Sequence, residues 1–386
     1  MKIMHCCLAA FYIDNYSYQE NILPKLHKIQ GHDVKIVAST ETYVDNKNLG
    51  YIEPSSYINE NGIEVTRLPY VSWLPGIIGR KLRKYKGLSK ILQQFNPDIV
   101  FLHDAQFLSV LEIKSYVKKN PDVKIFADCH TDFINSGRGW VSKNILHKIL
   151  YKWMIQQIEP HLSKFYGTLP IRCEFLNEVY GVPKSKIELL RLGADDTAYN
   201  LDDKESIKNR FRKKYDIPTN SQIIITGGKI DERKKIHWLL EAFKEINRED
   251  FFLVVFGVPN QETKELIKPY EKLKNVIFVG WLNSVEIYNT LLAGDLAVYP
   301  GTHSVLWEQT VGIGLPCVFK RWKGIEHVDV GGNCIFLETG DVDEIKSVLE
   351  ELMTNNELLD GLKKESLEKG PSNFAYSEIA KNAIEI

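Results

Sequence analysis

The chain alternates apolar runs of strand length with longer stretches in which apolar residues recur at helical spacing. Strands that alternate with helices form βαβ units, which build a parallel sheet. In the first half of the chain the pattern predicts a helix at 18–30 and strands at 2–8, 33–38, 63–68, 98–102, 123–128, 164–168 and 187–191. In the second half it predicts strands at 222–226, 251–256, 276–279, 295–299 and 316–319, and helices at 236–246, 341–353 and 355–369. The sequence therefore predicts two α/β domains, each built on a doubly wound parallel sheet.

The length of the chain supports this division. Its 386 residues exceed what one hydrophobic core usually supports. We place an N-terminal domain at 1–199 and a C-terminal domain at 200–370. Gly370 and Pro371 are expected to break the chain before a last helix within 371–386, because neither residue favours a helix interior.

Composition and charge narrow the class of protein. Hydrophobic residues make up 44% and charged residues 26%, which is typical of a globular chain. A net charge of -1 argues against nucleic acid as a partner. The six cysteines show no metal-ligand spacing, which favours a reducing cytoplasm. The N-terminal stretch turns polar too early for a signal peptide, and no apolar run approaches about eighteen residues. We therefore expect a cytoplasmic protein that does not span a membrane.

Two segments of the first half are rich in basic residues. The segment 79–92 holds six basic and no acidic residues, with apolar residues near helical spacing. The segment 143–153 repeats this pattern less strongly. Cationic amphipathic helices bind anionic membrane surfaces, so a peripheral position on the inner face of a membrane is one interpretation. The other is a solvated charged face over an apolar core.

The segment that follows the strand at 295–299 offers a site for a nucleotide. Pro300 and Gly301 end the strand, and a helix is predicted to begin near Ser304. The first turn of a helix presents N–H groups and a positive dipole end to a phosphate. Glu308 follows one turn later, about the offset between the phosphates and the ribose of a nucleotide. A partly exposed carboxylate that accepts from both ribose hydroxyls fits this position; the alternative is a merely solvated glutamate.

A basic cluster precedes the helix predicted at 236–246. The segment 227–235 reads GGKIDERKK and contains four basic residues, Lys229 and Lys234 among them. Cations at the start of a helix oppose its dipole, which costs a few tenths of a kcal/mol each unless an anion is bound. A diphosphate would supply that anion. The alternative is again a solvated cluster.

The segment 308–318, EQTVGIGLPCV, resembles the Glu-Ala-x-Ala-x-Gly-x-Pro-Val signature of retaining glycosyltransferases of family 4. That family has the GT-B fold, in which two Rossmann-like domains face a central cleft. The resemblance implies that the acceptor binds to the domain at 1–199 and the nucleotide sugar to the domain at 200–370, and that the last helix within 371–386 crosses back onto the first domain. The resemblance implies that Glu308 binds the ribose of the donor and that the backbone of His303 and Ser304, together with Val305, lies at the phosphates. The chain departs from the family at Pro300, where an acidic residue usually contacts the donor sugar.

The resemblance extends to two further places. Gly228, Lys229 and Lys234 match the family's Gly-Arg-x-x-x-x-Lys pattern, with lysine in the position of the arginine. His130 follows the strand at 123–128, where family 4 enzymes commonly place a histidine against the donor sugar. A lone histidine at such a position is otherwise more often structural. The resemblance implies His130, Lys234 and Glu308 as candidate catalytic residues.

Together these features predict a glycosyltransferase that moves a sugar from a nucleoside diphosphate sugar to a glycan or lipid-linked acceptor, as in bacterial surface-polysaccharide synthesis. The resemblance implies retention at the anomeric carbon and no required metal or other cofactor. No Asp-x-Asp pair follows a predicted strand of the second half, where a magnesium-bridged diphosphate would need one. The alternatives are an epimerase or phosphorylase on the same scaffold and a non-enzymatic two-domain sugar-binding protein.

Overall fold

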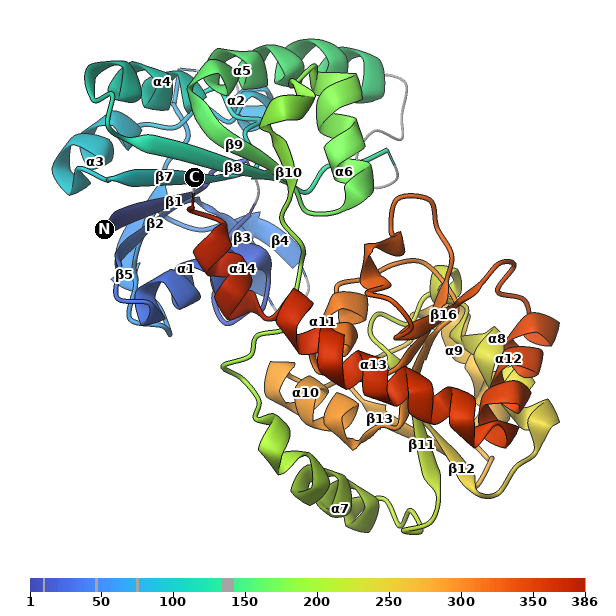
Figure 1. Ribbon diagram of the computed structural model, residues 1–386. Coiled ribbons are helices and arrows are strands. Elements are labelled where there is room, and N and C mark those ends of the chain that lie inside the picture. Colours follow the sequence, from blue (N-terminus) through green and yellow to red (C-terminus); the bar gives the residue numbers. More distant parts are fainter. Residues whose placement is uncertain (10, 46–47, 74–75, 134–141, 386) are drawn as a thin grey trace. The chain divides into compact units, whose positions relative to one another are not determined.

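The computed structural model describes residues 1–386 apart from 10, 46–47, 74–75, 134–141 and 386. It divides the chain into two compact units. The first unit comprises Met1–Arg191 and Glu378–Ile386, and the second unit comprises Leu192–Ser377. Each unit contains a parallel sheet between layers of helices, which confirms the predicted fold class (Figure 1). The last residues of the chain, Glu378–Ile386, belong to the first unit.

The sheet of the first unit has eight strands in the order β10-β9-β8-β7-β1-β2-β6-β5. Its strands are β1 (Lys2–Cys7), β2 (Asp33–Ser39), β5 (Ser55–Ile58), β6 (Glu64–Leu68), β7 (Ile99–His103), β8 (Lys124–Cys129), β9 (Leu162–Gly167) and β10 (Ile187–Leu189). All pairs are parallel except β5 with β6. A separate hairpin pairs β3 (Glu41–Asp45) with β4 (Asn48–Tyr51). The apolar pattern did not predict β3, β4 or β5, which carry polar and half-exposed residues.

The sheet of the second unit has six parallel strands in the order β13-β12-β11-β14-β15-β16. Its strands are β11 (Gln222–Gly227), β12 (Phe251–Phe256), β13 (Val276–Gly280), β14 (Leu296–Tyr299), β15 (Cys317–Lys320) and β16 (Cys334–Leu337). The strand order reverses direction between β11 and β14, next to the chain's glycine-rich turn at 227–228. Ligands of doubly wound sheets bind beyond the carboxyl ends of the strands at such a point.

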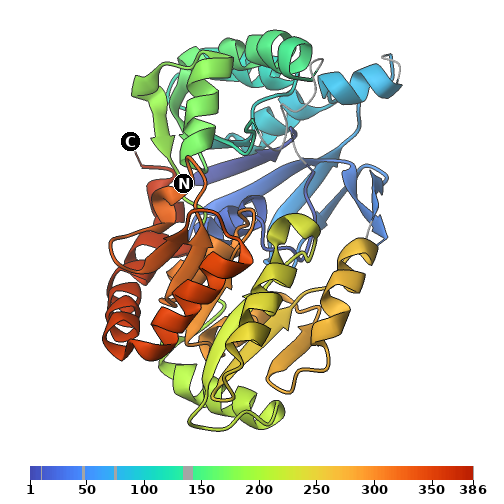
Figure 2. The same cartoon turned by 90° about the vertical axis from the view of Figure 1, so that its right-hand side faces the viewer.

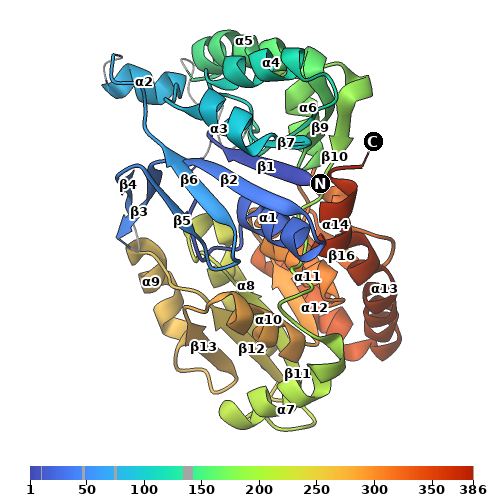
Figure 3. The same ribbon diagram turned by 90° about the vertical axis from the view of Figure 1, so that its left-hand side faces the viewer.

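Helices cover both faces of each sheet (Figures 2 and 3). In the first unit they are α1 (Gln19–Ile29), α2 (Gly76–Leu82), α3 (Leu88–Phe95), α4 (Val110–Lys119), α5 (Lys152–Ile158), α6 (Pro170–Phe175) and most of α14 (Tyr376–Asn382), whose first two residues belong to the second unit. In the second unit they are α7 (Lys204–Lys214), α8 (Ile236–Ile246), α9 (Gln261–Ile267), α10 (Ser284–Ala293), α11 (Leu306–Gly312), α12 (Val342–Thr354) and α13 (Asn356–Phe374). Apolar side chains of α8, α9 and α12 pack on one face of the second sheet, and those of α7, α10 and α11 pack on the other.

The expected break at Gly370 and Pro371 is wrong. Helix α13 continues through both residues and ends at Phe374. A Cβ atom at position 370 would lie 2.1 Å from the carbonyl oxygen of Val311, so only glycine lets α13 approach α11 this closely. Tertiary packing therefore overrides the low helix propensity of this pair.

The single amphipathic helix predicted at 79–92 is also wrong. Helices α2 and α3 are separated by a turn in which Arg83 and Gly87 have positive φ angles of 51° and 102°. Between them the buried Tyr85 donates a hydrogen bond of 2.8 Å to the carbonyl of Leu8. Burial of this aromatic ring in the core stabilises the turn. The second basic segment forms a π-helix, η1 (Ser142–Tyr151), that runs into α5, and the side chain of Lys143 lies outside the described part.

Candidate functional site

The loop between β14 and α11 presents successive backbone N–H groups. Helix α11 begins at Leu306, two residues later than predicted, with Val305 in the N-cap position. The backbone N–H groups of His303, Ser304 and Val305 form no hydrogen bond with any residue that the structure describes. Unpaired, neighbouring N–H groups at the end of a parallel strand are donors for an anion.

The ammonium group of Lys234 holds this loop in place. Its Nζ atom donates hydrogen bonds of 2.6 Å to the carbonyl of Thr302 and 2.8 Å to that of His303. Burial lowers the pKa of Lys234 to about 8, while Asp231 acts in the opposite direction. A small pocket here is lined by Lys234, by the loop and by the end of β11, with Thr226, Gly227, Ile236, Tyr299, Pro300, Gly301, Thr302, Ser304 and Trp307. The structure thus brings Lys234 to the loop that sequence reasoning assigned to phosphate.

The other basic residues of the cluster differ in their partners. Arg233 pairs with Asp231 at 2.6 Å, and Lys235 lies 3.8 Å from a carboxylate oxygen of Glu232. Lys229 is exposed, and its side chain has no hydrogen-bond or ion-pair partner within the described residues. Two of the four charges are therefore balanced locally, and Lys229 is available to an anion.

Gly228 positions this turn against the helix. Its φ angle is 104°, a conformation that glycine adopts without strain. A Cβ atom there would lie 2.7 Å from Cδ1 of Leu306, the first residue of α11. The residues Gly228, Lys234, His303, Ser304, Val305 and Glu308 consequently belong to one part of the second unit, around the ends of β11 and β14.

Glu308 is completely buried, and the expectation of a partly exposed carboxylate is wrong. Its Oε1 atom lies 2.8 Å from Nε2 of His303 and 2.9 Å from Nε2 of His327, and its Oε2 atom lies 3.0 Å from Nε2 of His303. Burial by itself would raise the pKa of Glu308. The two imidazoles outweigh that effect and hold the pKa at about 2, so the carboxylate is charged at neutral pH.

Sequence reasoning missed His327. It lies in the short 3-10 turn η8 (Glu326–Val328), 19 residues from Glu308, and its side chain is only 3% exposed. Its Nδ1 atom is buried and has no hydrogen-bond partner in the described part of the chain. No motif or spacing links it to Glu308; only the fold brings the two together.

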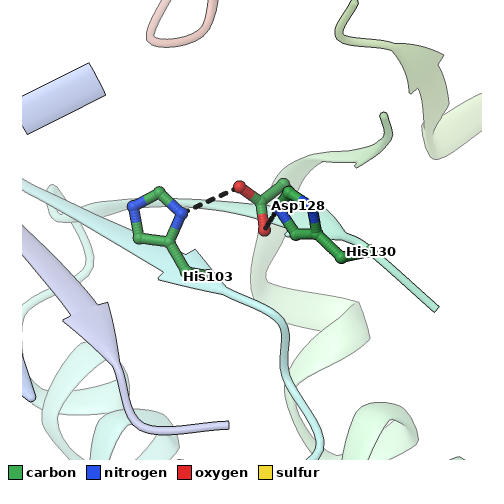
Figure 4. Close-up of side chains that lie close together, drawn as sticks. All are labelled: His103, Asp128 and His130. Atoms are coloured by element: carbon green, nitrogen blue, oxygen red, sulfur yellow. Dashed lines mark hydrogen bonds and ion pairs between the residues drawn. The ribbon is translucent and has the colours of Figure 1, made fainter. Parts of the chain in front are cut away.

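In the first unit, His130 follows β8 and faces a buried carboxylate (Figure 4). Oδ2 of Asp128 accepts a hydrogen bond of 2.9 Å from Nδ1 of His103, and Oδ1 lies 3.4 Å from Nε2 of His130. The backbone N–H of Asp104 donates to the same Oδ1 at 3.0 Å, and Oδ1 of Asp104 accepts from the backbone N–H of His130 at 3.1 Å. Both the side chain and the main chain of His130 are therefore fixed.

The charges in this cluster support one another. Burial alone would lower the pKa of His130, but Asp128 raises it to about 9, with further help from Asp104 and Glu20. Burial alone would raise the pKa of Asp128, but His103 and His130 hold it well below its usual range. The ligand atoms of His103, Asp128 and His130 lie within 4.8 Å of one another, close enough for a cation. Because each imidazole already has the carboxylate as its partner, we interpret the group as a proton-sharing cluster, and the absence of a required metal stays a prediction.

Two family models match the chain, one in each half. The model described as Glycosyltransferase Family 4 matches residues 18–198, and the model described as Glycosyl transferases group 1 matches residues 207–369. The processive diacylglycerol alpha-glucosyltransferase of Acholeplasma laidlawii is 28% identical over 211 residues, 52% of this chain and 58% of that protein. The lipopolysaccharide core biosynthesis glycosyltransferase LpsE of Rhizobium meliloti is 25% identical over 155 residues, 38% of this chain and 44% of that protein. The chain thus spans about half the length of the curated relatives it matches.

Solved structures share the fold over nearly the whole chain. WaaG, a glycosyltransferase involved in lipopolysaccharide biosynthesis, superposes with a TM-score of 0.66 and 15% identity and covers 99% of this chain and 98% of that one. HepE from Anabaena, in complex with UDP and glucose, gives a TM-score of 0.67 and 13% identity, with the same coverage. At these identities the likeness establishes the architecture alone.

The contrast between Lys234 and Lys229 gives a stability prediction. We expect Lys234→Met to lower the free energy of unfolding by about 1.5 to 3 kcal/mol, because it removes two charge-assisted hydrogen bonds to loop carbonyls and keeps the aliphatic stem. The exposed Lys229→Met should change it by less than about 0.5 kcal/mol. Urea unfolding of both variants at pH 7 measures this. Equal effects of the two substitutions would contradict the structural role of Lys234.

Proposed function

The chain belongs to glycosyltransferase family 4 and has the GT-B fold, and from that premise we propose that it transfers a sugar from a nucleoside diphosphate sugar to a glycan or lipid-linked acceptor with retention at the anomeric carbon. The observation that carries the proposal is the set of N–H groups at 303–305, which have no partner among the described residues. They lie in the loop that Lys234 holds and are followed by the buried Glu308. The N–H groups suit the diphosphate of a nucleotide, and the carboxylate three residues later suits the hydroxyls of its ribose.

Each charge has a role in this mechanism. The leaving diphosphate develops negative charge, which the N–H groups of His303, Ser304 and Val305 and the ammonium of Lys229 stabilise without rearrangement. The main role of Lys234 is to hold the loop in place, because its ammonium contacts two carbonyls of that loop. No metal ion is needed in this scheme, since protein donors meet the charge.

Glu308 accepts hydrogen bonds from the ribose hydroxyls. Its charge is maintained by His303 and His327, so it remains a strong acceptor although it is buried. His303 is 12% exposed at its side chain and is the less buried of the two partners. We propose that a bound ribose takes over part of the hydrogen bonding that His303 supplies in its absence.

His130 acts on the donor sugar in this proposal. Asp128 holds its imidazole as a cation at neutral pH, because the raised pKa of about 9 exceeds the ambient pH. A cationic imidazole donates charge-assisted hydrogen bonds to a sugar hydroxyl. The family signature usually carries an acidic residue that contacts the sugar at the position of Pro300, so we propose that the polar contacts to the sugar come from other residues.

The names of two relatives are consistent with an acceptor at a membrane. One is named for action on diacylglycerol and another for lipopolysaccharide core biosynthesis. We propose an acceptor of the same general kind, a lipid-linked sugar or a surface glycan, handled on the inner face of a membrane. Searched over the described residues, the chain contains no helix that is both long and apolar enough to cross a bilayer.

The surface of η1 and α5 suits peripheral contact with lipid. Ile145, Ile149 and Trp153 follow one another at intervals of four residues and are 44%, 64% and 44% exposed. The exposed Lys148 lies beside them in sequence. Apolar side chains next to lysine suit an anionic interface. By comparison, Arg80 stacks on Tyr51 and Lys84 pairs with Glu112, so the charges at 79–92 are partly engaged within the first unit. We therefore propose η1 and α5 as the principal membrane contact.

The transfer reaction is tested directly with a panel of nucleoside diphosphate sugars and lipid or glycan acceptors in excess chelator. We expect product with the anomeric configuration of the donor, seen by NMR, and an unchanged rate after divalent ions are added. Lys229→Met should raise the KM for the donor several-fold, while Lys244→Met, on the exposed side of α8, serves as the matched control. Epimerised donor without transfer, or turnover that requires the added metal, would contradict the proposal.

Membrane association is tested by flotation with vesicles that contain anionic lipid. We expect the double variant Ile149→Ser and Trp153→Ser to lose most binding, because its apolar contact area is removed and its charge is unchanged. Trp281→Ser in the second unit is the matched control, since this tryptophan is 72% exposed. Wild-type binding that is equal on neutral vesicles, or that survives in the double variant, would exclude this surface.

A further inference from the structure

A line of buried histidines connects Asp128 with α14 inside the first unit. His103 on β7, His5 on β1 and His27 on α1 are at most 1% exposed. Nε2 of His27 lies 2.8 Å from the carbonyl oxygen of Ala380, and its Nδ1 lies 3.0 Å from Nε2 of His5. Nδ1 of His5 lies 3.0 Å from Nε2 of His103, whose Nδ1 lies 2.9 Å from Asp128. The described contacts thus form four hydrogen bonds in series.

The carbonyl at one end fixes the direction of this series. A carbonyl oxygen only accepts, so Nε2 of His27 carries hydrogen. If His27 is neutral, its Nδ1 accepts from Nε2 of His5, and by the same rule Nδ1 of His5 accepts from Nε2 of His103. His103 then has its hydrogen on Nε2, while its Nδ1 faces a carboxylate that also only accepts. Three neutral imidazoles supply three hydrogens for four hydrogen bonds, so the series needs one additional proton, taken from solvent.

Burial and the neighbouring charges decide where that proton is held. Burial lowers the pKa of His5 well below its usual range and that of His27 to about 4. His32 also disfavours charge on His27, and among the described residues Asp128 is the only carboxylate in hydrogen-bond contact with the series. The other charged groups near this end are His130, Asp104 and Glu20, and the two acids favour a cation. The additional proton therefore belongs on His103, in contact with Asp128.

We infer that His5 and His27 are positioning residues that keep His103 as an imidazolium in contact with Asp128. His103 in turn positions the carboxylate of Asp128, and the carbonyl of Ala380 on α14 fixes the direction of the whole series. The charged His103 binds Oδ2 of Asp128 and so turns Oδ1 toward His130. It also offsets part of the attraction that Asp128 exerts on a proton of His130. The inference rests on the proposed function only in naming His130 as the residue that acts on the sugar.

NMR of the full-length protein with nitrogen-15-labelled histidine tests the hydrogen count without any activity measurement. At pH 7 in the presence of chelator, the nitrogen shifts should show His5 and His27 as neutral rings with hydrogen on Nε2 and His103 with hydrogen on both nitrogens. Single His→Gln variants assign the signals. A neutral His103 in the wild-type protein would overturn the inference, whether or not the protein transfers sugar.

Two substitutions of His27 test the role of the Ala380 carbonyl. In His27→Phe two rings and two hydrogen bonds remain, so two neutral imidazoles supply all the hydrogens that are needed. His5 can then donate to His103 instead of accepting from it, and His103 should become neutral. In His27→Gln the amide can donate to Ala380 and accept from His5, so His103 should stay charged. His32→Gln is the matched control, because His32 lies beside His27 and its backbone N–H donates to the backbone carbonyl of His27 at 3.1 Å, a contact that this substitution keeps. A charged His103 in folded His27→Phe would overturn the role of α14.

The titration of His130 in the same spectra separates positioning from mere stability. Loss of the charge on His103 should raise the pKa of His130 by roughly one pH unit in His27→Phe, because a like charge nearby is removed. His27→Gln and His32→Gln should leave that titration in place. If His27→Phe does not fold, His5→Asn supplies the same comparison, since it interrupts the series at the next ring. If His103 is neutral in the variant and the pKa of His130 is unchanged, then the charge on His103 does not act on His130 and the inference is overturned.

Discussion

The structure depends on two buried carboxylates, each held between two imidazoles. Glu308 and Asp128 are both 0% exposed, and moving an ion from water into a protein interior costs several kcal/mol even after relaxation. That cost is offset only where the partners are well placed. His303 and His327 supply them for Glu308, and His103 and His130 supply them for Asp128. The segments that carry these histidines are held in place by their contacts with the two carboxylates.

Fixed charges also position the candidate functional residues of each unit. In the second unit, the ammonium of Lys234 fixes two carbonyls of the loop that precedes α11, and the N–H groups next to them stay available. In the first unit, Asp104 ties the main chain of His130 while Asp128 holds its side chain. Groups that are fixed beforehand cost no reorganisation when charge develops during transfer.

Much of the fold and part of the site could be predicted from the sequence. Most of the parallel strands were found because they are continuous β-branched or aromatic runs, as in β11 and β12, whereas the less buried β16 was missed. The signature around Glu308 identified the family. Elements set by tertiary contacts were not predictable. Packing against Val311 carries α13 through Pro371, and burial of Tyr85 splits the basic segment into two helices. His327 was missed for the same reason, because only the fold brings it to Glu308.

The most direct test of the buried carboxylate as a ribose acceptor is a double-mutant cycle. Calorimetry would compare a nucleoside diphosphate with its 2'-deoxy counterpart on wild-type protein and on Glu308→Gln, at a temperature where circular dichroism shows both proteins folded. We predict that loss of the hydroxyl weakens wild-type binding at least about tenfold and weakens the variant little further, a coupling of about 1.5 to 3 kcal/mol. Equal losses in the two proteins would contradict the assignment and leave Glu308 a purely structural partner of its two histidines.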